Sequence, residues 1–237
     1  MKLSTLLLSA LSAGAFACSL APAARAAAPI IDWDPAYTWE EGATATHSPP
    51  GGEFKLVGTI SMFGPPLNFL DATDPSKEFT FYAHGLISQG TTSQGPPTTT
   101  LYTTNYSGGT IEVYQDSAPN ATFAPFPPNA AVPSTFIDGG APILTGFFTS
   151  FTVQTNNFTA YNVGNIEGTI TWTGGTVFGQ LSTSGGGPCP GLFVGGATWN
   201  PGVLIPGYIF RHDGKIDLQC PVPVRGSTWG RLKTLYH

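Results

Sequence analysis

The sequence is poor in charged residues, and few of those are basic. Aspartate, glutamate, lysine and arginine make up 10% of its 237 residues, with nine lysines and arginines against fourteen aspartates and glutamates. An average soluble domain contains about 25% charged residues. A chain with so few basic side chains lacks the positive surface that binds nucleic acids and anionic membranes. We therefore expect no nucleic-acid partner, and a surface formed largely by threonine, serine, asparagine and glycine.

Long apolar runs are absent after the first residues of the chain. Lys2 precedes an apolar run over residues 3–17, and Ala24-Arg25-Ala26 supplies small residues at the positions of a cleavage site. This is the pattern of a secretory signal peptide of bacterial type, which we predict over residues 1–26. The mature protein is then secreted or held at the cell surface, with the periplasm as a second compatible compartment. Cleavage before Cys18 would instead give a lipoprotein. No later run is long enough for a transmembrane helix.

Cysteine is also scarce. Of the three cysteines, Cys18 belongs to the predicted signal peptide, which leaves Cys189 and Cys220. An even pair in an exported protein predicts a disulfide, the alternative being two free thiols. Zinc is not expected, because no third and fourth ligand lie at the required spacing. We expect no cofactor.

Amphipathic helices are missing as well: before residue 225 no apolar stripe with a 3.6-residue period exceeds two turns. Alternation with a period of two is common instead, and it is clearest where Ile166, Gly168, Ile170 and Trp172 are separated by Glu167 and threonines. Such segments form strands with one buried face. Roughly ten short strands between glycines and prolines predict an all-β domain over residues 27–220. We expect an antiparallel β-sandwich, with a β-barrel as the alternative.

Glycine-containing pairs suggest where the strands turn. Gly174-Gly175, Asp213-Gly214 and the segment 107–109 each have the composition of a hairpin turn. Residues 88–97 and 182–202 are rich in glycine, proline and polar residues, and we expect them to be loops.

Nucleophilic catalysis finds little support in the sequence. The Gly-x-Ser-x-Gly pattern is absent, and His47, His84, His212 and His237 are best interpreted as surface histidines. A glycan hydrolase would need two carboxylates that converge on one cleft. The carboxylates near predicted strands are those of Glu40, Glu41, Glu112 and Glu167.

Two short acidic segments could supply oxygen ligands to calcium. Asp32 and Asp34 flank Trp33, and Asp71 and Asp74 lie three residues apart. Neither segment has the spacing of an EF-hand loop. Aspartates that stabilise turns are the alternative interpretation.

Trp33, Tyr37 and Trp39 share the same parity in what we expect to be an edge strand or an extended lead-in. Three rings in a row on one face could stack on sugar rings, as in a carbohydrate-binding module. The alternative is that they pack as a lid on the edge of the sandwich.

The last residues, 221–237, differ from the rest. They begin with Pro-Val-Pro and contain Arg225, Arg231 and Lys233 without any acidic residue. This tail is either a frayed terminus or an export or attachment signal.

Two stretches, 136–151 and 168–176, resemble the body of secreted bacterial β-rich proteins of the PEP-CTERM (exosortase-sorted) type. Members of that group end in Pro-Glu-Pro, a membrane helix and a basic cluster. This chain has Pro-Val-Pro and basic residues, and the sorting signal itself is not present. The resemblance implies export and a β domain, and it implies no catalytic residues.

These features together predict an exported non-catalytic protein, structural or adhesive, at the cell surface or in the extracellular matrix. Its expected partners are glycans or other cell-surface components. The alternatives are a carbohydrate-binding module that uses Trp33, Tyr37 and Trp39 and, with less support, a glycan-active hydrolase.

Overall fold

The computed structural model describes residues 29–123, 134–157, 162–182 and 187–220. The predicted signal peptide, Cys18 and the tail from residue 221 lie outside this part of the chain. The described residues contain nine strands and two short 3-10 helices. The strands are β1 (Ile31–Trp39), β2 (Glu53–Phe63), β3 (Glu78–Gln94), β4 (Leu101–Ser107), β5 (Thr110–Asp116), β6 (Leu144–Asn156), β7 (Val163–Gly174), β8 (Gly191–Thr198) and β9 (Phe210–Leu218), and the helices are η2 (Ser134–Phe136) and η3 (Phe178–Leu181).

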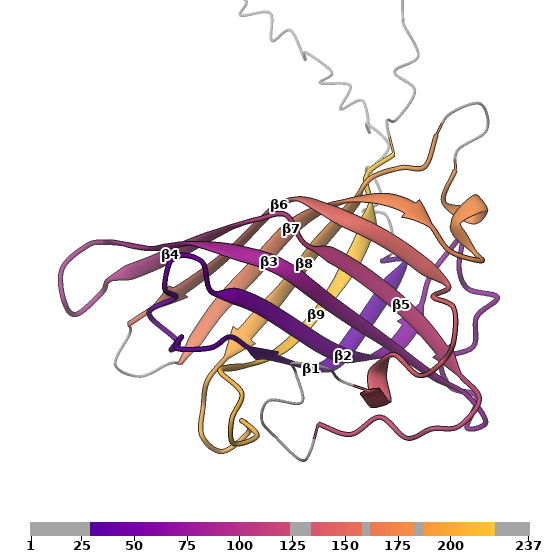
Figure 1. Ribbon diagram of the computed structural model, residues 1–237, viewed down its shortest axis with the longest axis horizontal. Coiled ribbons are helices and arrows are strands. Elements are labelled where there is room, and N and C mark those ends of the chain that lie inside the picture. The colour runs from indigo at the N-terminus through magenta and orange to yellow at the C-terminus, as the bar shows by residue number, and fades with distance from the viewer. Residues whose placement is uncertain (1–28, 124–133, 158–161, 183–186, 221–237) are drawn as a thin grey trace, which may run out of the picture.

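The strands form a closed antiparallel β-barrel (Figure 1). Their order is β2-β1-β9-β8-β7-β6-β4-β3-β5, and a further pairing of β2 with β3 closes the ring. Strands β4 and β5 share one position: both lie antiparallel to β3 and both pair with β6. The barrel therefore has eight strand positions. The all-β prediction is confirmed, but the predicted sandwich is wrong and the alternative, a barrel, is present.

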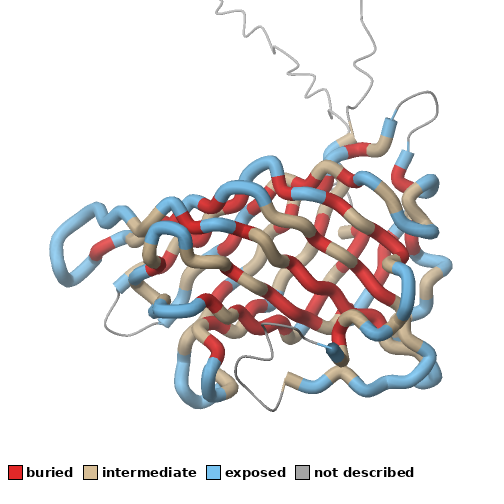
Figure 2. Tube along the Cα trace, viewed as in Figure 1, coloured by how far each residue is buried: buried red, intermediate tan, exposed pale blue. Residues whose placement is uncertain are grey.

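The pattern at 166–172 predicted the faces of β7 correctly. Ile166, Ile170 and Trp172 are at most 2% exposed and point into the barrel, whereas Glu167 is exposed. Figure 2 shows the same alternation of buried and exposed residues along the strands of the barrel wall.

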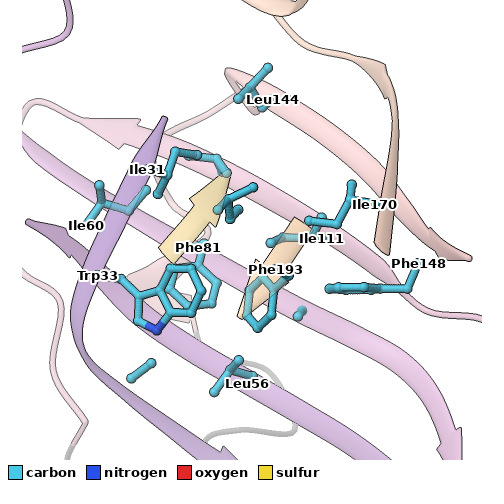
Figure 3. Packing of buried hydrophobic residues seen from close by; sticks show 14 of the residues in the cluster. Ile31, Trp33, Leu56, Ile60, Phe81, Ile111, Leu144, Phe148, Ile170 and Phe193 are labelled. Atoms are coloured by element: carbon cyan, nitrogen blue, oxygen red, sulfur yellow. The ribbon is translucent and has the colours of Figure 1, made fainter. Parts of the chain in front are cut away.

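Aromatic and aliphatic side chains together fill the middle of the barrel (Figure 3). Trp33 stacks on Phe193 with ring centroids 4.4 Å apart, and Phe81 meets Trp33 edge-on at 5.4 Å. All three are at most 1% exposed. Fully buried side chains of this size each contribute about 1.5–3 kcal/mol through removal of apolar surface from water. The centre of the barrel is a packed hydrophobic core.

Asp213-Gly214 is not a hairpin turn, as the sequence had suggested, but part of the continuous strand β9. Gly214 faces inward and pairs with Trp33 of β1. A Cβ atom on Gly214 would lie 2.5 Å from the Trp33 ring. The glycine at this position provides space for a large ring. The sequence alone does not distinguish such a glycine from one in a turn.

The other two predicted hairpins are also wrong. Residues 107–109 join β4 to β5 within one strand position, and β4 and β5 do not pair with each other. Gly174-Gly175 ends β7, but the following residues form η3 and no strand. Two predicted loops contain strands: β3 continues through Ser88 to Gln94 and pairs there with β4, and β8 lies within 182–202.

Strand β1, expected to be an edge strand or an extended lead-in, has neighbours on both sides, β2 and β9. Its register shifts between Trp33 and Ala36 on both partners. Because of this irregularity, Trp33 and Ala36 both point inward, and Tyr37 points outward to a second cluster on the outer wall.

The disulfide between Cys189 and Cys220 is present, as predicted. It connects the segment before β8 to the residue pair that follows β9, and the Gln219 amide donates a hydrogen bond to the Pro190 carbonyl beside it. In the described part of the chain no helix is long and apolar enough to cross a membrane.

Candidate functional site: a polar trough on the outer wall

A hollow of about 430 Å³ lies on the outer wall of the barrel, over β1, β7, β8 and β9. Its floor contains Gly195 and Gly196 of β8. The position of Gly196 points outward, and the nearest atom to a Cβ there would be the Asp213 carbonyl oxygen at 3.9 Å. The wall is hollow here because an outward-facing position between Asp213 and Asn165, its cross-strand neighbours, carries no side chain.

A second hollow of about 230 Å³ adjoins the first. It lies over β6 and β7, and the two share Asn165 and Glu167. We call the two hollows together the polar trough. Its outward-facing side chains are those of Asp32, Ser150, Thr152, Gln154, Asn165, Glu167, Val194, Asp213 and Lys215.

The acidic side chains of the trough are only partly compensated. Burial raises the pKa of Asp32, and the nearby charge of Asp213 raises it further. Lys215 is the basic residue in the trough, and its ammonium group lies 2.8 Å from a carboxylate oxygen of Asp217, outside the trough. The trough therefore has a negative potential.

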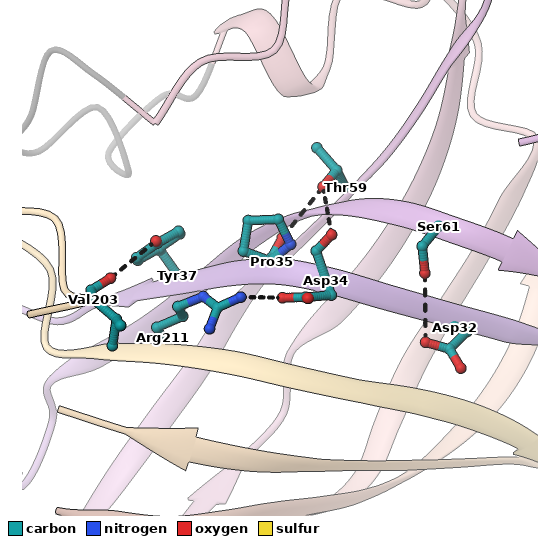
Figure 4. Close-up of polar contacts among 8 residues, drawn as sticks. All are labelled: Asp32, Asp34, Pro35, Tyr37, Thr59, Ser61, Val203 and Arg211. Carbon is teal, nitrogen blue, oxygen red and sulfur yellow. Dashed lines mark hydrogen bonds and ion pairs between the residues drawn. The ribbon is translucent and has the colours of Figure 1, made fainter. Parts of the chain in front are cut away.

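The carboxylates of Asp32 and Asp34 in β1 have different partners (Figure 4). Asp34 forms an ion pair with Arg211. Among the described residues, the Asp32 carboxylate accepts one side-chain hydrogen bond, from the Ser61 hydroxyl at 3.5 Å, at the limit of a hydrogen bond, and the charge of Lys215 acts on it as well. Asp34 is thus held by a charged partner, whereas the Asp32 carboxylate can accept hydrogen bonds from a ligand.

Asn165, Glu167 and Asp213 have exposed side chains. None of the three forms a side-chain hydrogen bond or an ion pair with another described residue. Their donors and acceptors face solvent and are available to a polar ligand.

The three aromatic residues predicted to form a glycan platform do not share one surface. Trp33 is buried in the barrel core. Tyr37 is 6% exposed in the outer cluster, where its hydroxyl donates a hydrogen bond to the Val203 carbonyl. Trp39 is partly buried with Lys55 over its ring. The expected parity fails at the register shift that follows Trp33, and the alternative of a lid on a sandwich edge fails with it.

The four glutamates named as hydrolase candidates are dispersed. Glu112 pairs with Thr145 of β6, whereas Glu167 pairs with Thr152 of the same strand. Seven residues of extended strand place these two positions roughly 20 Å apart, beyond the separation of about 5–10 Å that glycosidases use. Glu40 is buried at one end of the barrel, and Glu41 is exposed.

Glu40 belongs to a buried polar network that sequence reasoning missed. Its carboxylate accepts hydrogen bonds from the Ser48 hydroxyl at 2.5 Å and the Tyr106 hydroxyl at 3.0 Å, and Ser88 Oγ lies 2.6 Å from Ser48 Oγ. Burial raises the pKa of Glu40. The space beside this network is only about 10 Å³, at the lower limit of what can hold one water molecule. The network closes the barrel end and has no room for a substrate.

The histidines lie in different environments. His84 is partly exposed on the outer wall and stacks on Tyr82. His47 is exposed, and His237 lies outside the described residues. The prediction of a surface location is wrong for His212, which is 1% exposed inside the barrel with Nε2 2.7 Å from the Thr38 hydroxyl. Burial lowers the pKa of His212 to about 3.

Asp71 and Asp74 stabilise their own turns. Asp71 accepts hydrogen bonds from the amide and hydroxyl of Thr73, and Asp74 does the same with Ser76. These bonds lower the pKa of both carboxyl groups, that of Asp74 to about 2. Among the described residues no three potential ligands are grouped to hold a metal ion. The geometry fits turn-forming aspartates.

Comparisons of the chain with protein-family models, with curated proteins and with solved structures gave no match. The resemblance to PEP-CTERM proteins remains a prediction. A function has to be inferred from the geometry of the barrel and its outer wall.

Proposed function

We propose that the protein is exported and non-catalytic, and that it has a structural or adhesive role at the cell surface or in the extracellular matrix. The observation that carries this proposal is where its polar groups lie. Unpaired polar side chains such as Asn165 and Glu167 gather on the outer wall, whereas the middle of the barrel is filled by apolar side chains. A closed barrel with a packed core meets its partners through its outer wall and loops.

Two further observations support this role. The Cys189–Cys220 disulfide is compatible with an oxidising compartment outside the cytoplasm. Of the glutamates named from the sequence, Glu112 and Glu167 are too far apart to act together on one glycosidic bond, and Ser48 is buried beside a space that admits no substrate.

The experiment that tests the proposal expresses the full chain with its first 26 residues in a bacterial host. We expect the protein outside the cytoplasm, with Cys189 and Cys220 unreactive toward alkylating reagents until they are reduced. Beads coated with the exported protein should retain bacterial cells or extracted matrix. Cytoplasmic protein with free thiols, or beads that retain neither material, would contradict the proposal.

A carbohydrate-binding module is the second candidate. The observation that favours it is the polar trough, and not the three aromatic residues named from the sequence.

A further inference from the structure

We propose that the polar trough binds an extended, uncharged polysaccharide along the outer wall of the barrel. This inference rests on the proposed function and specifies the chemistry of the partner. It stands on the composition of the trough, its shape and its charge.

The composition of the trough suits a ligand that is rich in hydroxyl groups. A hydroxyl group both donates and accepts hydrogen bonds. Carboxylates only accept, an ammonium group only donates, and a carboxamide does both. The trough combines all three kinds of group in Asp32, Glu167, Asp213, Lys215 and Asn165. The second hollow adds the hydroxyl groups of Ser150 and Thr152 and the carboxamide of Gln154.

The floor suits the C–H surface of a sugar ring. Gly196 lets a ligand approach the backbone closely, and Val194 offers an apolar contact beside it. A few placed polar groups determine the orientation of a ligand in its site, and the polar side chains around Gly196 and Val194 can do so here.

The shape favours a polymer over a compact molecule. The trough crosses five neighbouring strands in the order β1-β9-β8-β7-β6. Four spacings of about 4.8 Å give a path of about 19 Å along the curved wall. Asn165 and Glu167 line both hollows and lie on β7, where the two hollows meet.

The charge discriminates between classes of polysaccharide. Three carboxylates line the trough, and the one ammonium group there already pairs with Asp217. Polymers that carry uronic acid or sulfate groups would be repelled. An uncharged polymer is therefore the expected ligand.

The test fills the floor of the trough without disturbing the barrel. In Gly196→Leu the new Cβ meets no atom closer than 3.9 Å, and the side chain projects into the hollow. The matched control is Gly179→Leu in η3, where a Cβ would meet nothing within 4 Å and which lines neither hollow. Asn165→Ala removes a carboxamide that lines both hollows, and Gln180→Ala removes an exposed glutamine outside the trough as its control.

The probes are microcrystalline cellulose, chitin, soluble dextran and, as a polyanion, alginate. We expect the exported wild-type protein to bind at least one of the first three and not alginate. Gly196→Leu should weaken that binding at least tenfold, Asn165→Ala several-fold, and the two controls less than twofold. A circular dichroism melt establishes that each variant is folded.

Two outcomes overturn the inference and leave the proposed function intact. In the first, the wild type and Gly196→Leu bind a polysaccharide equally well. In the second, coated beads retain cells or matrix although none of the three uncharged polymers is bound. A preference for alginate would overturn the charge argument and the inference with it. If beads retain neither cells nor matrix and no polymer is bound, the inference and the proposed function both fail.

Discussion

Replacing His212 with glutamine tests whether a buried neutral histidine makes the barrel sensitive to acid. His212 is 1% exposed, contacts Thr38 through Nε2 and lies near the rings of Phe54 and Phe210. Burial lowers its pKa to about 3 from the ordinary value of 6.5. The unfolded chain therefore binds a proton between these two values, and the folded chain does not.

The sign and size of the effect follow from linkage. Because the unfolded state binds more protons between pH 6.5 and pH 3, the free energy of unfolding decreases as the pH falls through that window. With pKa values of about 3 and 6.5, the decrease between pH 7 and pH 5 is about 2 kcal/mol. For a chain of this length that corresponds to a melting temperature lower by about 4–8 °C.

The assay is chemical denaturation of the wild type and of His212→Gln at pH 7 and pH 5. We expect His212→Gln to be less stable than the wild type at pH 7, because the imidazole packs in the core. Its loss of stability between pH 7 and pH 5 should be smaller by about 2 kcal/mol. The control is Gln180→Ala, which changes an exposed side chain without a titratable group and should keep the wild-type pH dependence. If His212→Gln loses as much stability on acidification as the wild type, the assignment of a neutral buried imidazole is wrong.

Three further predictions concern stability. Burial raises the pKa of Glu40, so protonation of this group makes the folded state more stable as the pH falls toward 4.5. Glu40→Gln lacks this gain and should therefore lose more stability than the wild type between pH 7 and pH 5 in the same denaturation assay. Gly214→Val should lower the free energy of unfolding by about 1–3 kcal/mol, because its Cβ would lie 2.5 Å from the Trp33 ring, whereas Gly196→Val should be nearly neutral. Equal denaturation midpoints for the two variants would contradict the close packing of Gly214 against Trp33. The Cys189–Cys220 disulfide closes a loop with a sequence separation of 31, and its reduction should lower the free energy of unfolding by about 3–4 kcal/mol. The measurement compares denaturation curves with and without dithiothreitol, and identical curves would show that the loop is equally constrained without the bond.

Local alternation of side chains was sufficient to predict strands and their buried faces where the rhythm is unbroken, as in β7. It failed where a strand contains an irregularity. After the register shift that follows Trp33 in β1, inward-facing and outward-facing positions exchange. Residues four apart in a regular strand point to the same face, but Trp33 and Tyr37 point to opposite faces. In β3, the partners also shift near Gly85, and Leu86 faces the core while Ile87 is 38% exposed. One extra residue in a strand reverses every assignment beyond it.

The distinction between a sandwich and a barrel could not be made from local pattern. In both, strands alternate between a buried and an exposed face. The decisive pairings are β1 with β9 and β2 with β3, and the first joins residues near opposite ends of the described chain. Glycine pairs added to the difficulty, because Asp213-Gly214 has the composition of a turn and lies in the middle of a strand.

The polar trough was equally inaccessible from the sequence. The outward direction of Glu167 could be predicted from its neighbours in β7, but not that Asp32 would lie on the far rim of the same hollow. Those two residues are brought together by the order β1-β9-β8-β7. The role of Gly196 could not be predicted, because the sequence does not distinguish a glycine on the outer wall of a barrel from a glycine in a loop.

At one place in the barrel wall, only glycine backbone lies between the core and the polar trough. Trp33 lies on the core side of this place. Gly195 of β8 and Gly214 of β9 are paired and both line the trough. Gly214 is also the position at which a Cβ would collide with the Trp33 ring. The residue that sequence reasoning assigned to a sugar-stacking surface therefore supports the floor of the trough from inside. Since a strand position without a side chain admits a ring on one face and a hollow on the other, this stretch of glycines serves packing and surface shape together.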